Sequence, residues 1–402
     1  MTFFILGHQP SLCAAEIASV LHIPLSHMKG NGDVLLIPED IHNLPSLQYA
    51  LGGTVKTGWT IGEMETWDDQ ALADLIAAYA VAAEGKEKIT FGISLYDLGG
   101  RVISVEKKKA VEHLGLMVKN ILKETGRPVR FVSSKEPTLS SVIVETNHLL
   151  SSGGEFVLFL DGARILVGQT QTVQDFAAWS DRDYGRPSRD AKSGMLPPKL
   201  ARIMINLAGK DITCATLLDP FCGSGTILME SALLECPHLI GSDISAKALE
   251  QTKRNMDWLF KNGFEKKPAI TLFETPAEHL PSLLTQSVDL IVTETYLGPP
   301  QKGRESSEAL LYALKDIEIM LSTSLPSLHR LIKKDGVMIL ACPVYRSKEK
   351  PLFLPMQKIT ESSGWQIESF PEALAPLSPS GGLIYERPGQ KVAREILKMT
   401  PI

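Results

Sequence analysis

The stretch LLDPFCGSGTILME, from Leu217 to Glu230, decides the fold class of the C-terminal half of the chain. An apolar, strand-like run precedes a turn that contains Gly223 and Gly225, and a helix-like segment begins directly after the turn. Glycines at such a turn let the backbone approach a ligand closely. The free N–H groups of a helix N-terminus suit a carboxylate or a phosphate. The turn therefore predicts a site for a ligand that carries an anion.

Segments on both sides of this turn alternate between strand and helix patterns. The apolar runs TLLDP, LIGSDI, AITLFE and VDLIVTE are predicted strands, and helix-like segments such as SAKALEQTKRNMDWLF lie between them. This alternation predicts a parallel, doubly wound α/β sheet, in which ligands bind beyond the carboxyl ends of the strands. The late runs WQIESF and GGLIYERP have no helix between them, which indicates an antiparallel pair at the far end of the sheet.

A carboxylate at the end of the second strand narrows the ligand to a nucleoside. Asp243 lies eighteen residues after Gly225, where an acidic side chain accepts hydrogen bonds from ribose hydroxyls. A dinucleotide fingerprint would have a third glycine where Leu228 stands, which argues against a nicotinamide dehydrogenase. Asp219, just before the glycines, suits an amine on the same ligand. S-Adenosylmethionine combines the carboxylate, the amine and the ribose.

The composition is that of an ordinary globular protein. With 402 residues, 44% hydrophobic and 22% charged, the chain is expected to form two or three domains. No stretch approaches the roughly 18 apolar residues of a membrane span, and the first residues lack the basic start of a secretory signal, so we expect a cytoplasmic protein. The five cysteines have no CxxC spacing, which argues against zinc and against disulfides, and no metal is expected.

One segment of this acidic chain is basic. Residues 86–135 contain eleven Lys and Arg and five Asp and Glu, a local charge of +6, which leaves −11 for the remainder of a chain with net charge −5. Such a segment indicates either contact with phosphates or a solvated helix surface, and charge alone favours the solvated surface.

Nearly the whole chain resembles the THUMP-containing tRNA guanine-10 N2-methyltransferase family. The stretch DPFCGSG is similar to motif I of class I methyltransferases that modify exocyclic amines, and the similarity is most specific in DRDYGRPSRDAKSGMLPPKLARIMINLA, IGSDIS and LIYERPGQKVAREIL. The resemblance implies an α/β fold: a Rossmann-like class I methyltransferase domain with a seven-stranded, mostly parallel sheet, preceded by α+β domains. The implied segments are a ferredoxin-like domain (1–65), a THUMP RNA-binding domain (66–175), a linker or binding loop (176–198) and the methyltransferase domain (199–402).

The resemblance also implies a site for S-adenosylmethionine. Its predicted residues are Asp219, Pro220, Phe221, Cys222, Gly223, Ser224, Gly225, Asp243, Ile244 and Glu274. The acid expected near the adenine after the third strand is Glu274 or Glu278, a choice that the residues leave open. The segment before the helix KLARIMINLA is expected beside the methionine end of the cofactor, with Ser193, Gly194, Met195 and Pro198.

The partner implied by the resemblance is tRNA, bound by the N-terminal half without any membrane contact. Phosphate contacts are predicted for Lys107, Lys108, Lys109, Arg127, Arg130, Lys135 and Arg186. Contacts of this kind fix affinity and register and do not read base identity. Whether a small activator subunit is needed stays open.

The catalytic motif departs from the family pattern. Amine methyltransferases of this type carry (D/N)PP(Y/F/W) after the fourth strand, because the amine must be oriented toward the methyl group and the base must be stacked. Here Glu294 stands where Asp or Asn belongs, Thr295 replaces the first proline, and Tyr296 comes one position early. Glu294 is predicted to orient the amine and Tyr296 to stack the base.

Several activities remain open on the sequence. The first is methylation of a guanine N2 amine, followed by methylation of another base and by RNA binding with little turnover. A DNA amino-methyltransferase shares DPFCGSG but does not need a THUMP-like segment.

Overall fold

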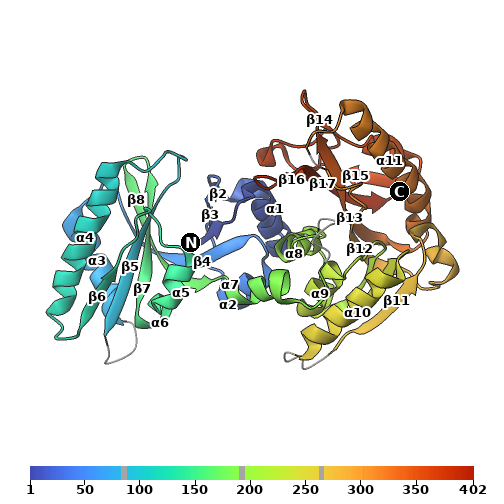
Figure 1. The fold of residues 1–402 in the computed structure, drawn as a ribbon. Helices are drawn as coiled ribbons and strands as arrows, with labels where there is room; N and C mark the ends of the chain where they lie inside the picture. The colour runs from blue at the N-terminus through green and yellow to red at the C-terminus, as the bar shows by residue number, and fades with distance from the viewer. Residues whose placement is uncertain (83–87, 190–194, 262–266, 302) are drawn as a thin grey trace. The chain divides into compact units, whose positions relative to one another are not determined.

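The computed structural model describes residues 1–82, 88–189, 195–261, 267–301 and 303–402 (Figure 1). These residues form two compact units. Unit 1 comprises Met1–Pro10 and Ser26–Phe176, and unit 2 comprises Ser11–Leu25 and Ala177–Ile402. The domain boundaries and domain types expected from the sequence remain predictions, and each unit is described by itself.

Unit 1 contains one continuous sheet in the order β2-β3-β1-β4-β8-β7-β5-β6. Its strands are β1 Thr2–Leu6, β2 Lys29–Gly30, β3 Val34–Ile37, β4 Thr54–Met64, β5 Ile89–Asp97, β6 Val129–Val132, β7 Gly153–Asp161 and β8 Arg164–Val173. The long strand β4 pairs with β1 along one edge and with β8 along the other. It therefore joins the first strands of the chain to the later ones.

Helices α3 (Asp69–Ala82) and α4 (Val105–Lys123) cover one face of β5–β8 (Figure 1). Leu72, Leu114 and Phe156 meet in the core between them. The short helices of this unit are α2 Leu44–Ala50, α5 Ser141–Thr146, α6 Leu149–Ser152 and the 3₁₀ turn η1 Leu25–His27. Helix α4 begins as the sequence predicts, because the Ser104 hydroxyl accepts a hydrogen bond from the N–H of Lys107.

The stretch SSVIVET is rich in β-branched residues, which favour a strand, but it forms the helix α5. The Ser140 hydroxyl accepts a hydrogen bond from the N–H of Ile143 and caps the helix. Val144 is then buried against Leu139 and Leu149. Local capping and packing outweigh the strand preference of the β-branched residues here.

Unit 2 contains the sheet that the sequence predicts. Its main strand order is β11-β10-β9-β12-β13-β17-β15, with β14 on β13 and β16 on β17. The strands are β9 Thr216–Asp219, β10 His238–Asp243, β11 Ala269–Glu274, β12 Val288–Glu294, β13 Ile332–Arg346, β14 Pro351–Leu352, β15 Trp365–Glu368, β16 Leu383–Tyr385 and β17 Val392–Pro401. The first five in the order run parallel, and β17 is antiparallel to both of its neighbours β13 and β15. The seven-stranded, mostly parallel Rossmann-like sheet is therefore confirmed.

The pairing predicted at the end of this sheet is wrong. WQIESF (β15) pairs with β17 and not with GGLIYERP, of which only β16 is a strand. The sequence reasoning missed β17 because Arg394, Glu395 and Lys398 interrupt its apolar pattern. Two of these charged residues are nevertheless buried, at 2% exposure for Arg394 and 0% for Glu395.

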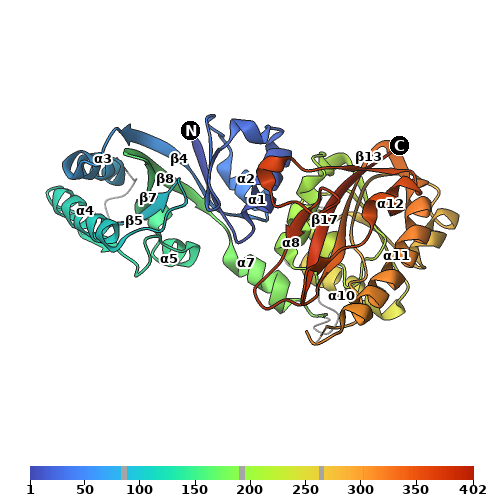
Figure 2. The same cartoon turned by 90° about the horizontal axis from the view of Figure 1, so that it is seen from above.

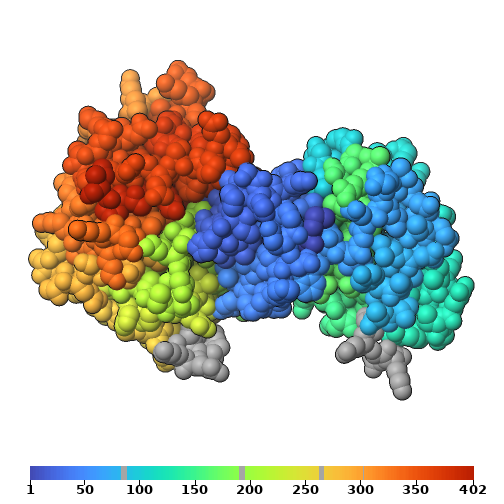
Figure 3. Space-filling model, turned by 180° about the vertical axis from the view of Figure 1, so that it is seen from behind, coloured from blue at the N-terminus to red at the C-terminus, as the bar shows by residue number. Residues whose placement is uncertain are grey.

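Helices cover both faces of the unit 2 sheet (Figure 2). Along β9, Leu217 faces one core and Leu218 the other, as the alternation of a strand requires. The first core includes residues of α1 Pro10–Leu21, α8 Pro198–Leu207, α9 Thr226–Leu233 and α10 Ala246–Lys261. The second core includes residues of α11 Ser307–His329, α12 Met356–Glu361 and the 3₁₀ segment η4 Ala277–Ser282. Figure 3 shows the surface from behind, with the C-terminal strands and helices of unit 2 in orange and red.

The segment before α8 differs from the sequence expectation. The segment expected to be a loop from Asp181 contains a π-helical turn, Asp181–Gly185, directly after α7 (Phe176–Ser180). Ser193 and Gly194 lie outside the described residues. No helix in the described part of the chain is long and apolar enough to cross a membrane.

Candidate active site

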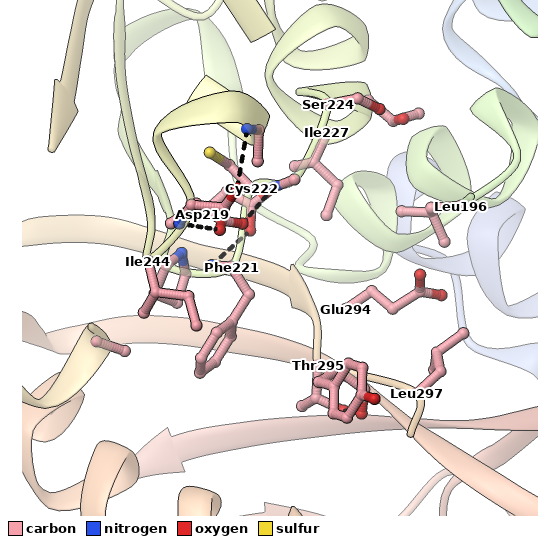
Figure 4. A pocket seen from close by; sticks show the side chains of 18 of the residues that line it. Leu196, Asp219, Phe221, Cys222, Ser224, Ile227, Ile244, Glu294, Thr295 and Leu297 are labelled. Atoms are coloured by element: carbon pink, nitrogen blue, oxygen red, sulfur yellow. Dashed lines mark hydrogen bonds between the residues drawn. The ribbon is translucent and has the colours of Figure 1, made fainter. Parts of the chain in front are cut away.

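A cavity of about 800 Å³ lies at the carboxyl ends of β9, β10 and β12. It is lined by all of the predicted cofactor residues except Gly225 and Glu274. Figure 4 shows Phe221 and Ile244 toward one side of this cavity and Glu294, Thr295 and Leu297 toward the other. The cavity therefore joins the predicted cofactor residues to the altered catalytic motif.

The glycine turn has the backbone that the sequence predicts. Gly223 and Gly225 have φ angles of +53° and +82°, a region that other residues rarely adopt. A Cβ atom on Gly225 would also lie 2.8 Å from the side chain of Thr252. Because Gly225 precedes α9 and offers no side-chain cap, the N–H groups of the first turn of α9 stay open to a ligand.

Asp219 ends β9 with its side chain buried, at 2% exposure. Its Oδ1 accepts hydrogen bonds from the hydroxyl of Thr293 at 2.6 Å and from the N–H of Phe221 at 3.3 Å. Burial raises the pKa of Asp219 to about 7, and these two hydrogen bonds oppose the rise. None of the ion pairs among the described residues includes Asp219. A cationic group of a ligand would supply the missing partner.

Asp243 is fixed at the end of β10 by two backbone donors. Its Oδ2 accepts from the N–H of Gly223 at 3.0 Å, and its Oδ1 accepts from the N–H of Ser245 at 2.9 Å. A carboxylate has about four acceptor positions, so lone pairs remain for hydroxyl groups of a ligand. The apolar side chain of Ile244 beside it is 74% exposed. Of the two candidate acids after the third strand, Glu278 lines the cavity and Glu274 does not.

The altered motif forms the other end of the cavity. Glu294 ends β12, and its Oε1 accepts a hydrogen bond from Nε of Arg394 at 2.5 Å. Burial raises the pKa of Glu294, and the charge and hydrogen bond of Arg394 oppose the rise. Tyr296 lines the cavity with 56% of its surface exposed, whereas Thr295 is buried.

The backbone after Glu294 is held in place by β13. The N–H of Thr295 donates to the carbonyl of Ala341 at 3.0 Å, and the Tyr345 hydroxyl donates to the carbonyl of Leu297 at 2.8 Å. Gly298 has a φ angle of +83°, and a Cβ atom there would overlap the Tyr345 hydroxyl oxygen. The loop that presents Tyr296 is therefore defined although it lacks the usual two prolines.

The structure separates the predicted RNA-binding residues of unit 1 into two groups. Lys107–Lys109 lie in the first turns of α4, at the carboxyl end of β5. Lys135 lies near the same end of β5. The carbonyl of Pro137, two residues after Lys135, accepts a hydrogen bond from the N–H of Leu95 near the carboxyl end of β5. Arg127 and Arg130 lie at the opposite end of α4, which spans about 28 Å at 1.5 Å per residue.

Arg186 is not presented for a phosphate contact in this structure. It belongs to unit 2, is 2% exposed, and donates to the hydroxyl of Thr226 at 2.7 Å in the first turn of α9. Burial lowers its pKa, and the charges of Asp183 and Glu230 oppose this effect. Arg186 thus links the segment before α8 to the glycine turn.

The sequence reasoning missed residues that support the site from behind. Thr293, Asn255 and Arg394 are all buried. Asn255 on α10 accepts from the N–H of Ser188 and donates to the carbonyls of Ser188 and Ser224, at 2.8–3.0 Å. For Thr293 and Arg394 the available signal was a polar or charged residue beside apolar residues, and it becomes informative only when the partner across the fold is known. Asn255 lies in a polar stretch and gives no such signal.

The comparisons with known proteins concern mainly unit 2. Residues 186–350 match the family described as RMKL-like, methyltransferase domain. The tRNA (guanine(10)-N2)-dimethyltransferase of Methanothermobacter thermautotrophicus is 32% identical over 157 residues, which are 39% of this chain and 41% of that protein. The protein of the same name from Methanocaldococcus jannaschii is 28% identical over 189 residues, 44% of this chain and 48% of that protein. The matches thus cover less than half the length of either curated relative.

A solved structure extends the likeness to the fold of the whole chain. TrmN from Thermus thermophilus matches with a TM-score of 0.56 at 14% identity, covering 100% of this chain and 99% of that one. At this identity the match concerns the fold alone. Asp219, Gly223 and Asp243, which line one cavity, all lie within residues 186–350, the segment that is similar to the RMKL-like methyltransferase domain.

Proposed function

We propose that this chain is an S-adenosylmethionine-dependent tRNA methyltransferase that modifies the N2 amine of a guanine. The observation that carries the proposal is the state of Asp219, a buried carboxylate without a cationic partner among the described residues, inside a cavity that the glycine turn and Asp243 also line. This combination fits a ligand that bears an ammonium group, a carboxylate and a ribose.

Each polar part of S-adenosylmethionine has a counterpart in the cavity. Asp219 would bind the ammonium group, the open N-terminus of α9 would bind the carboxylate, and Asp243 would bind the ribose hydroxyls. Phe221 and Ile244 offer apolar surface for the adenine. The bound cofactor supplies an electrophilic methyl group, and the residues of the chain orient the acceptor.

The chemistry of Glu294 favours guanine as the acceptor base. An ionised carboxylate only accepts hydrogen bonds. Guanine places the N1–H donor beside its N2 amine, whereas adenine and cytosine place an acceptor nitrogen beside theirs. A carboxylate at the catalytic position therefore matches two neighbouring donors of guanine, and Tyr296 is available to stack the base. The names of the two curated relatives also support a tRNA guanine.

Unit 1 would bind the RNA backbone. Lys107–Lys109 and Lys135 share one edge of its sheet and are our candidates for phosphate contacts there. Arg127 and Arg130 form a second candidate group at the opposite end of α4.

Two measurements test the proposal. Isothermal titration of the folded protein with S-adenosylmethionine should give a saturable heat at one site, and its absence would contradict the cofactor assignment. Incubation of unmodified tRNA, and separately of ribosomal RNA, with protein and cofactor should yield N2-methylguanosine in the tRNA, as measured by nucleoside mass spectrometry. Methylated adenosine or cytidine would identify another base, and modification of ribosomal RNA alone would refute tRNA as the substrate.

The same assay tests the catalytic residue. Glu294→Ala should lower the methylation rate on tRNA while the cofactor still binds, because Glu294 lies at the opposite end of the cavity from Phe221 and Ile244. Equal rates for the variant and the wild type would remove Glu294 from the mechanism.

A further inference from the structure

The Glu294–Arg394 pair is a further feature of the altered motif. The side chain of Glu294 is 13% exposed and that of Arg394 is 3% exposed, so both charges are largely removed from water. Glu294 lines the cavity, but Arg394 does not. Arg394 therefore lies behind the carboxylate and has no surface on which to meet a substrate.

The strand register explains how two residues far apart in the sequence meet. Glu294 pairs with Ala341 on β13, and Ala341 pairs with Ile396 on β17. Arg394 lies two residues from Ile396 toward the carboxyl end of β13, where it pairs with Pro343. Residues two apart in a strand point to the same face, so Arg394 and Ile396 lie on the same face of β17. On this face Ile396 packs in the core and Arg394 reaches Glu294.

Only one oxygen of Glu294 is used by this pair. Oε1 accepts from Nε of Arg394 at 2.5 Å, and no hydrogen bond to Oε2 is formed within the described part of the chain. The guanidinium group is further supported by the ring of Tyr385, whose centroid lies 5.9 Å from its central carbon. Tyr385 in turn accepts a hydrogen bond from Arg387. The arginine is thus fixed from behind while Oε2 is left for the cavity.

We propose that Arg394 is a positioning residue that holds Glu294 as an ionised, acceptor-only carboxylate with Oε2 directed to the acceptor amine. This inference rests on the proposed function and adds a role that the family pattern does not require, because the shorter Asp or Asn is replaced here. A longer side chain has an additional rotatable bond, and the hydrogen bond from Nε of Arg394 restricts that freedom.

The pair supports methyl transfer without taking part in it. The lone pair of the amine nitrogen forms the new N–C bond while the S–C bond of the donor breaks and its electrons stay on sulfur. The nitrogen then loses one hydrogen as a proton to water, directly or through Glu294. An ionised Glu294 orients the nitrogen, because its carboxylate oxygen accepts a hydrogen bond from the amine. A protonated carboxyl group has a hydrogen on one oxygen and therefore fewer positions that can accept the amine hydrogen.

The charged groups around Glu294 define the pH test. Arg394 on β17 favours the ionised form, burial opposes it, and Asp219 on β9 carries a second carboxylate in the same cavity. Tyr296, two residues after Glu294, lines the same cavity, and Arg387 and Tyr385 lie behind the arginine. A bound ammonium group keeps Asp219 ionised, so kcat at saturating cofactor isolates Glu294.

Infrared spectroscopy of the cofactor-free protein provides a readout that does not depend on turnover. Relative to wild type, Arg394→Gln should show an additional carbonyl band of a protonated carboxyl group at neutral pH, and this added band should vanish in Arg394→Gln/Glu294→Gln. Asp219, whose pKa is about 7, is partly protonated without cofactor and contributes the same band to every variant. Arg394→Lys should lack the added band, because it keeps a cation beside Glu294. Absence of the added band from Arg394→Gln would overturn the proposal.

The pH profile of kcat then tests the role in the reaction. Arg394→Gln should lose roughly tenfold or more in kcat at pH 7 and recover toward pH 9, with the KM for the cofactor little changed. Arg394→Lys should keep the wild-type profile at a lower plateau. A loss by the same factor at every pH would mean a merely structural role and overturn the proposal.

Two further variants separate folding and function. If Arg394→Gln does not fold, the near-isosteric variant Glu294→Gln provides the test. Its kcat should no longer fall at low pH, because the group that titrates has been removed. A kcat that still falls at low pH in this variant contradicts the proposal. Lys333→Gln is the matched control: it breaks the exposed pair with Asp289 at the other end of β12 and should leave kcat unchanged. The two proposals can fail separately. If the wild type transfers no methyl group but the infrared bands are as expected, the proposed function is refuted, whereas Arg394 is still the group that keeps Glu294 ionised.

Discussion

Two buried carboxylates, one in each unit, differ in what surrounds them. In unit 1, Glu155 accepts hydrogen bonds from Lys56 Nζ at 2.5 Å, from the Ser94 hydroxyl at 2.6 Å and from the Thr170 hydroxyl at 2.8 Å. In unit 2, Asp219 has one hydroxyl and one backbone N–H as donors and is paired with none of the cations among the described residues. Both side chains are almost completely buried.

The difference separates a structural acid from a binding acid. A buried charge is stable when a counter-charge and hydrogen bonds replace the water that it has lost. Glu155 has these partners within the fold, so its network connects β4, β5, β7 and β8. Asp219 lacks the counter-charge, and its pKa is raised to about 7 as a result of burial. In the proposed function, the ammonium group of the cofactor supplies this counter-charge.

The largest effect is expected in unit 1. Lys56→Met leaves the charge of Glu155 buried without its cation and should lower the free energy of unfolding by about 3–5 kcal/mol. Denaturant unfolding followed by circular dichroism measures this loss. Arg164→Gln, which removes a pair with Glu63 in which both side chains are exposed, is the control and should leave the midpoint unchanged. Equal midpoints for Lys56→Met and the control would end the distinction between the two acids.

Removal of the binding acid should affect the ligand more than the fold. Asp219→Ala should weaken cofactor affinity by about 1.5–3 kcal/mol, the value of a hydrogen bond to a charged group. Isothermal titration measures the change. Thr293→Val is the matched control, because it removes a donor to Asp219 and keeps the carboxylate. A cofactor affinity in Asp219→Ala equal to that of the wild type would show that the ammonium group binds elsewhere.

Cofactor affinity should depend on pH in a defined direction. The carboxyl group of Asp219 is neutral below its pKa of about 7, so affinity for an ammonium group should fall as the pH decreases. Between about pH 7.5 and pH 5.5 the expected decrease is roughly 20-fold. In Thr293→Val the decrease should begin at higher pH, because the hydroxyl of Thr293 lowers the pKa of Asp219. A flat profile would be inconsistent with an ionised Asp219 as the binding group.

The smallest effect concerns the surface of unit 1. Lys107–Lys109→Ala should weaken tRNA binding and reduce the salt dependence, by about 0.9 in slope for each duplex phosphate that the variant no longer neutralises. Arg127→Ala/Arg130→Ala tests the other end of α4. The slope of log Kd against log salt concentration for each variant will show which group binds the phosphates. If neither slope changes, both groups belong to a solvated surface.

The parallel part of the sheet of unit 2 and the turn that lines the cavity could be predicted because their signals are local. The turn around Gly223 and Gly225 and the acid at the end of β10 follow from residue type and spacing within one strand-turn-helix unit. The strand β17 was missed because its buried charges have partners on other strands, such as Glu294 for Arg394. A single sequence does not reveal such a pairing, since it depends on the register of three strands.

The location of Arg186 was mistaken for a similar reason. An arginine in a segment rich in glycine, proline and charge has the composition of a surface loop. Its bond to Thr226 arises only when α9 folds beside that segment. The choice between Glu274 and Glu278 also depends on the path of the chain after β11, which turns Glu278 toward the cavity.

The hydrogen bonds of Asn255 have a mechanical consequence. The chain leaves unit 1 at Phe176, and the segment that follows includes Ser188. The side chain of Asn255 donates hydrogen bonds to the carbonyl of Ser188 and to the carbonyl of Ser224 in the glycine turn. Arg186 adds a second attachment at Thr226. A displacement of the segment that follows unit 1 therefore strains the hydrogen bonds that hold the glycine turn, so the two cannot move independently.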